Sequence, residues 1–104
     1  MRDKAFYKNR LFSLLNHDAA IDCETLIEYG YDAIEKGNFI KAFRLFMLGY
    51  RLIGNNAEIL NGMALSLCEL GRLKFSKSIL LFALKKFPDN VLLLTNLATV
   101  YFDE

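Results

Sequence analysis

The chain contains no tryptophan, one proline, one histidine and two cysteines among its 104 residues. Cys23 and Cys68 have neither a CxxC nor a Cys/His spacing, so they predict no disulfide framework and no metal site. A histidine-based site needs a nucleophile or further ligands beside the histidine, so His17 is expected to be a solvated side chain. No glycine-rich phosphate loop is present. We therefore expect neither enzymatic activity nor a cofactor or bound metal.

Long apolar runs are also missing. The longest, 79–84, is far shorter than the roughly 20 residues that a membrane-spanning helix needs, and the first residues do not resemble a secretory signal. The 13 basic and 12 acidic residues give a net charge of +1, which is no electrostatic footprint for nucleic acid. These absences predict a soluble, cytoplasmic protein without membrane insertion and without a nucleic-acid partner.

Apolar residues, in contrast, make up 54% of the chain, and the mean hydropathy is +0.21. They recur at helical spacing in six segments and predict helices over 4–16, 23–36, 39–53, 57–70, 73–87 and 91–102. Asp22 and Asn38 are expected to cap the helices that follow them. Gly37 and Gly71 suit helix C-termini, and Pro88 cannot continue the fifth helix.

The pattern repeats with a period of 34 residues, which separates Gly37 from Gly71 (71 − 37 = 34). A fixed period of this size indicates stacked helical hairpins, each burying its apolar face against its neighbours. The period divides the chain into 1–22, an N-terminal amphipathic helix and connection, followed by the units 23–56, 57–90 and 91–104. The basic residues Arg2, Lys4, Lys8 and Arg10 of the first segment are interpreted as a solvated face, with an anionic surface or nucleic acid as the alternative.

Aligned on this period, the units resemble the tetratricopeptide repeat family. Small residues recur at repeat positions 8, 20 and 27, and large apolar residues recur at position 4, where the family has tryptophan. These residues are Gly30, Ala64 and Ala98; Ala42 and Ser76; Gly49 and Ala83; and Leu26, Leu60 and Leu94. The resemblance implies an all-α, right-handed stack of antiparallel helix hairpins. Only two repeats are complete, however, and the polar capping helix of the family is missing.

In this family the first helix of each repeat lines a concave groove. The resemblance therefore implies a partner-binding groove formed by Ile27, Tyr31, Ile34, Asn61, Leu65, Cys68, Leu92, Thr95, Thr99 and Phe102, and Glu24 and Glu58 also occupy positions that point into it. Family members that grip a carboxy-terminus carry lysine, arginine and asparagine there, whereas this groove has Ile27 and Tyr31. A peptide or helix with apolar anchor residues suits it better. Ile34 and Leu65 are equally well interpreted as core, and Cys68 as a small buried apolar residue.

Size, repeat style and apolar groove are similar to those of the tetratricopeptide chaperones of bacterial type III secretion, which hold hydrophobic secreted subunits in a soluble state. The expected function is thus that of a small chaperone or adaptor for a protein partner. A structural subunit that joins a larger complex through its exposed helix faces is the alternative. Because the segment 91–102 is apolar around nearly its whole circumference, we also expect a second copy or the partner to cover this end.

Overall fold

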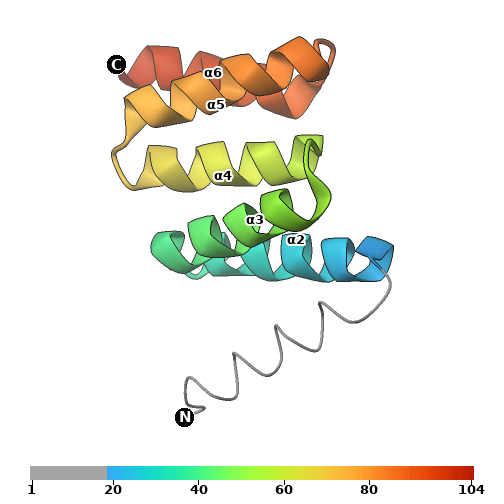
Figure 1. Ribbon diagram of the computed structural model, residues 1–104. Helices are drawn as coiled ribbons and strands as arrows, with labels where there is room; N and C mark the ends of the chain where they lie inside the picture. Colours follow the sequence, from blue (N-terminus) through green and yellow to red (C-terminus); the bar gives the residue numbers. More distant parts are fainter. Residues whose placement is uncertain (1–18) are drawn as a thin grey trace.

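The computed structural model describes residues 19–104, so the expected helix over 4–16, its basic residues and His17 lie outside the described residues. The described part is all-α, as predicted, and contains no strand. Its helices are α2 (Ala19–Glu35), α3 (Phe39–Ile53), α4 (Ala57–Glu69), α5 (Leu73–Lys86) and α6 (Val91–Asp103). Figure 1 shows them as successive layers, with the C-terminus at the far end of the stack from α2.

The predicted helix boundaries agree with the structure within one residue, except at the start of α2. This helix begins at Ala19, so Ala19 and Ala20 are helical rather than part of a connection. Asp22 consequently lies inside the helix, and its prediction as an N-cap is wrong. The two alanines explain the difference, because alanine has the highest helix propensity of all residues and extends the helix beyond the aspartate.

The two turns that carry the 34-residue repeat have the same geometry. Gly37 and Gly71 adopt φ values of 78° and 79°, a left-handed conformation that favours glycine. The next backbone N–H in each turn, from Asn38 or Arg72, donates to a carbonyl five residues back at 2.8 Å. This hydrogen bond closes the helix end as in a Schellman motif. Glycine at these two positions therefore fixes where α2 and α4 end.

Asparagine caps two of the helices, but not the predicted one. The Asn38 side chain makes no capping hydrogen bond to α3, and its backbone (ψ 69°) is not in the extended conformation that capping residues usually adopt. Asn56 and Asn90 are extended, and their side chains accept hydrogen bonds from Ile59 N and Leu93 N at 3.1 and 3.0 Å. Asn38 therefore stands at the N-cap position of α3 as predicted, but its side chain does not cap the helix, because its backbone also closes the preceding one.

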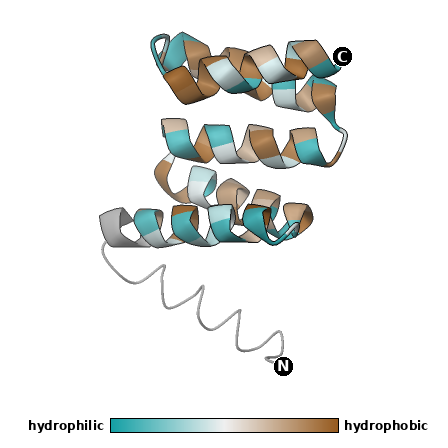
Figure 2. Cartoon of the chain, turned by 180° about the vertical axis from the view of Figure 1, so that it is seen from behind, coloured by the Kyte–Doolittle hydropathy of each residue, from teal (hydrophilic) through white to brown (hydrophobic). Residues whose placement is uncertain are grey.

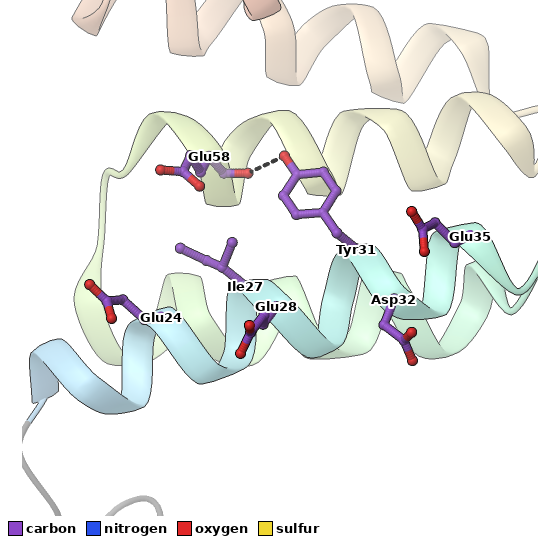
Figure 3. A pocket seen from close by; sticks show the side chains of 7 residues that line it. All are labelled: Glu24, Ile27, Glu28, Tyr31, Asp32, Glu35 and Glu58. Carbon is purple, nitrogen blue, oxygen red and sulfur yellow. Dashed lines mark hydrogen bonds between the residues drawn. The ribbon is translucent and has the colours of Figure 1, made fainter.

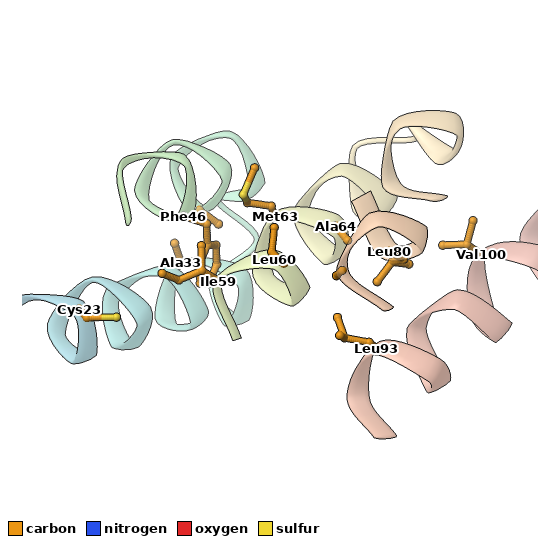
Figure 4. Close-up of a cluster of buried hydrophobic side chains, with 12 residues drawn as sticks. Cys23, Ala33, Phe46, Ile59, Leu60, Met63, Ala64, Leu80, Leu93 and Val100 are labelled. Atoms are coloured by element: carbon orange, nitrogen blue, oxygen red, sulfur yellow. The ribbon is translucent and has the colours of Figure 1, made fainter. Parts of the chain in front are cut away.

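The helix α4 lies at the centre of the packing. It contacts α3 and α5, its neighbours along the chain, and also α2 and α6, whereas α3 and α5 make no helix–helix contact with each other. Seven of its thirteen residues are therefore buried, including Ile59, Leu60 and Ala64. Figure 4 shows the resulting cluster, which continues from Cys23 in α2 to Val100 in α6.

The largest buried side chain, Phe46 of α3, is inserted between α2 and α4. A Cβ atom added to Gly30 of α2 or Gly62 of α4 would lie within 3 Å of the Phe46 ring. The ring also meets Tyr31 edge-on, with 5.0 Å between the ring centroids. The two glycines thus let α2 and α4 approach the ring closely. Of the two, only Gly30 was predicted from the sequence to lie at a close helix crossing.

The small residues of the two complete units are buried as predicted. Ala42, Ala64, Ser76 and Ala83 have no exposed surface, and Gly30 and Gly49 are also buried. In the third unit Ala98 is exposed and Leu94 is 47% exposed, because no described helix follows α6 to pack against this side. Helix α6 instead packs Leu93 and Val100 against the core.

Candidate functional site

A hollow of about 640 Å³ lies beside α2 and the start of α4 (Figure 3). Ile27 and Tyr31 contribute its apolar side chains. The remaining lining residues are acidic: Glu24, Glu28, Asp32, Glu35 and Glu58. The sequence analysis had placed Glu24, Ile27, Tyr31 and Glu58 in a common groove, and the structure brings these four together in the hollow.

Three of the carboxylates, Glu28, Asp32 and Glu35, were missed as site residues because they do not lie at the repeat positions that point into the groove of the family. Their spacing contains the signal, since Glu24, Glu28 and Asp32 follow one another at four-residue intervals along one face of a helix. An exposed ion pair between Lys36 Nζ and Asp32 Oδ2, at 2.9 Å, lies at one end of the row. Five carboxylates around two apolar side chains make the hollow negative.

A chain of hydrogen bonds runs from Tyr31 into the stack and connects the first helices of all three units. Tyr31 Oη donates to the Glu58 carbonyl at 3.1 Å and accepts from Asn61 Nδ2 at 2.9 Å. Asn96 Nδ2 of α6 in turn donates to Asn61 Oδ1. Burial raises the pKa of Tyr31, so the phenol stays protonated and can act as a donor. Asn96 was not identified from the sequence. Its only distinguishing feature there is an amide side chain in the predominantly apolar segment 91–102.

Asn61 is 4% exposed, and its amide both donates and accepts within the protein. It therefore positions Tyr31 and α6 and does not line the surface of the hollow. Removing one member of such a buried network leaves its partners unsatisfied, which costs about 1–3 kcal/mol.

We expect Asn61→Ala to lower the free energy of unfolding by about 1–3 kcal/mol, and Asn96→Ala to lower it by less, since Asn96 is only half-buried. Urea unfolding of both variants and of the double variant would measure the coupling between the two amides. Because they share one hydrogen bond, the two effects should not add. Fully additive effects would mean that the amides act independently.

The other predicted groove residues do not line the hollow. Ile34 and Cys68 are half-buried against the core, and Leu65 is half-buried without belonging to the core cluster. Leu92, Thr95, Thr99 and Phe102 are exposed on α6, where Thr99 Oγ1 donates to the Thr95 carbonyl at 3.1 Å. The ten predicted residues therefore form three groups. Ile27 and Tyr31 line the hollow, Ile34, Asn61, Leu65 and Cys68 are buried or half-buried outside it, and Leu92, Thr95, Thr99 and Phe102 are exposed on α6.

The cysteines give no sign of reactivity. Cys23 is buried, Cys68 is half-buried, and neither forms a disulfide. Burial is the main cause that raises the pKa of both thiols, which keeps them protonated at neutral pH. Within residues 19–104, no group of histidine, cysteine and carboxylate side chains is arranged to hold a metal ion.

No family model matches the chain, and no curated protein matches it either. None of the five described helices is long and apolar enough to cross a membrane.

Proposed function

We propose that this protein is a tetratricopeptide-like adaptor or chaperone that binds an apolar segment of another protein in the hollow beside α2 and α4. The hollow itself is the observation that carries the proposal. It offers an apolar floor, Ile27 and Tyr31, to anchor side chains of a partner. Its rim of carboxylates fits basic groups on either side of those anchors. The partner chemistry is therefore apolar residues flanked by lysine or arginine.

The tetratricopeptide-like, right-handed arrangement is part of the proposal. It is supported by equivalent positions 34 residues apart: α3 and α5 begin at Phe39 and Leu73, and α4 and α6 begin at Ala57 and Val91. The matching glycine turns and the buried small residues of the two complete units support it as well. In such a stack the first helices share one side, and the hollow lies on α2 and α4, two of these first helices.

A role as a type III secretion chaperone in the cytoplasm is the most specific form of the proposal. Such a chaperone keeps a hydrophobic subunit soluble by covering its apolar residues until the subunit is exported. The support is the similarity of size and repeat style, together with a hollow that combines apolar anchors with charge. The unfilled space suits a short helix or an extended segment rather than a folded domain.

The second candidate, a structural subunit of a larger complex, is favoured by a different observation. Large apolar side chains are exposed on α5 and α6, including Phe75, Phe82, Leu92 and Phe102. A structural subunit would bury these faces permanently. The two candidates differ in the surface they use, so substitutions in the hollow distinguish them.

The proposal predicts that a synthetic amphipathic peptide with leucine anchors and flanking lysines binds the protein, and that raising the salt concentration weakens binding. Replacing the lysines of the peptide by glutamates should weaken binding at least about tenfold, equivalent to about 1.4 kcal/mol. The double variant Glu24→Lys, Glu28→Lys should weaken binding of the lysine peptide to a similar degree. Fluorescence anisotropy of the labelled peptides would measure these affinities.

The control is Glu69→Lys, Asp89→Lys, which changes the net charge equally at exposed carboxylates that do not line the hollow. This variant should bind the lysine peptide nearly as well as the wild type. Equal losses in the two double variants would show a general charge effect and would refute a site in the hollow.

A further inference from the structure

Helix α6 presents an apolar face that no described helix covers. The face consists of Val91, Leu94 and Ala98, all of them exposed, and Tyr101, which lies against Lys77 of α5, is at its edge. The neighbouring Phe102 is 90% exposed. The adjacent side of the helix is inserted in the core, where Leu93 has no exposed surface. Figure 2 shows hydrophobic residues, in brown, along the helix that ends at the C-terminus.

The orientation of α6 is fixed by its contacts with α5. Lys77 Nζ forms an ion pair with Glu104 Oε1 at 3.0 Å and lies 4.4 Å from the centroid of the Tyr101 ring. Leu93 and Val100 are buried on the adjacent side, so α6 cannot rotate to hide Leu94 without exposing these core residues. The exposed face is thus a defined surface of the folded chain.

The earlier units show what shape fits this face. The residues 34 positions before Leu94 and Ala98 are Leu60 and Ala64 (94 − 34 = 60, 98 − 34 = 64), and both are buried in α4, which packs against α5. Another 34 positions back, Leu26 and Gly30 are buried in α2, which packs against α3. In both cases a small residue marks the crossing with an antiparallel helix. The face of α6 therefore fits an apolar helix that crosses it at Ala98.

We propose that α6 of a second copy of this chain occupies the face, antiparallel and related by a two-fold axis near Ala98. Helix α6 supplies the required apolar surface, and its charges are complementary in this arrangement. Asp103 and Glu104 lie at its C-terminal end, whereas Lys85 and Lys86 end α5 just before α6 begins. Antiparallel pairing places each acidic end beside the helix N-terminus and lysines of the other copy.

Head-to-tail association of copies is disfavoured by the other end of the stack. Helix α2 exposes Glu28, Asp32 and Glu35. Placing Leu94 and Tyr101 against them would bury Glu28 and Glu35 without partners and would take the Lys36–Asp32 ion pair out of water, both of which are costly. The proposed assembly is therefore a closed pair. The paired surface lies on α6 and not in the hollow, so pairing of two copies can be tested independently of peptide binding.

The two-fold axis provides a charge-swap test at Ala98, whose exposure lets the isolated chain tolerate substitution. Ala98→Lys and Ala98→Glu each place like charges opposite each other in the pair, so each protein alone should remain a monomer. Mixing them places lysine opposite glutamate and should restore a pair. The wild type should approach twice the chain mass of 12.0 kDa at high concentration and fall to that mass on dilution. Sedimentation velocity of each protein and of the mixture would measure this.

Ile40→Lys is the control, because Ile40 is an exposed apolar residue on α3, which does not contact α6. This variant should pair like the wild type, and circular dichroism should show unchanged helix content in all variants. Four results would each overturn the proposal: a wild type that is monomeric at every concentration, masses that grow beyond two copies, dissociation by Ile40→Lys, or a lysine–glutamate mixture that stays monomeric.

Discussion

Phe46→Ala should lower the free energy of unfolding by about 3–5 kcal/mol, the largest effect expected of any single substitution in the chain. The ring fills the space between α2 and α4, where Gly30 and Gly62 offer no side chain that could replace it. The cavity would therefore remain open or draw the two helices apart. A domain of this size is stabilised by only about 5–15 kcal/mol in total, so much of the variant could be unfolded at moderate temperature.

Phe75→Ala is the matched control, since Phe75 is 65% exposed on α5. It should change the free energy of unfolding by no more than about 0.5 kcal/mol. Urea unfolding followed by far-ultraviolet circular dichroism would measure both variants. Similar losses in the two would contradict the central position of Phe46.

Ala64→Leu is the second substitution with a large expected effect, a loss of about 1–3 kcal/mol in the free energy of unfolding. Ala64 has no exposed surface, and α5 comes so close that Ser76 Oγ donates to the Ala64 carbonyl at 2.7 Å. Three additional carbon atoms cannot enter this crossing unless α4 and α5 move apart. The hydrogen bond from Ser76 would then be lengthened or lost.

The control for Ala64→Leu lies at the same position of the next unit. Ala98 is exposed, so Ala98→Leu should leave the unfolding of the monomer nearly unchanged. Thermal and urea unfolding should be compared at protein concentrations low enough for the monomer to dominate. Equal destabilisation at both positions would mean that α6 packs within the chain through Ala98.

The sequence was sufficient to predict the helices and turns because these depend on local features. Apolar spacing indicated each described helix, and Gly37 and Gly71 end α2 and α4 with the positive φ values that glycine accommodates. The small residues at positions 8, 20 and 27 were correctly assigned to close helix crossings in both complete units. Each of these features can be recognised within one repeat.

Apart from the cap assignments of Asp22 and Asn38, what the sequence did not predict concerns relations between helices. The apolar pattern of 91–102 indicated that one helix would not cover all of α6, but not which residues stay uncovered: Leu93 is buried, whereas Leu94 and Ala98 are exposed. Gly62 acquires its role only because Phe46 reaches α4 from α3. Such contacts depend on which helix is adjacent, and the period of the sequence does not contain that information.

The candidate site was predicted in part for the same reason. Ile27 and Tyr31 were identified by their repeat positions, and they do line the hollow. Most of the negative rim was missed, because the repeat positions assign only Glu24 and Glu58 to the groove, whereas Glu28, Asp32 and Glu35 also line the hollow. Glu58 lies beside the carboxylates of α2 because α4 packs against α2, from which it is separated by α3.

The proposal of a binding hollow is tested most directly by nuclear magnetic resonance of the labelled protein, titrated with the leucine–lysine peptide. We expect the amide resonances that shift to belong to α2 around Ile27 and Tyr31 and to the start of α4 at Glu58, with little change in α3. Shifts confined to α5 and α6, or no shifts at saturating peptide, would contradict a binding site in the hollow.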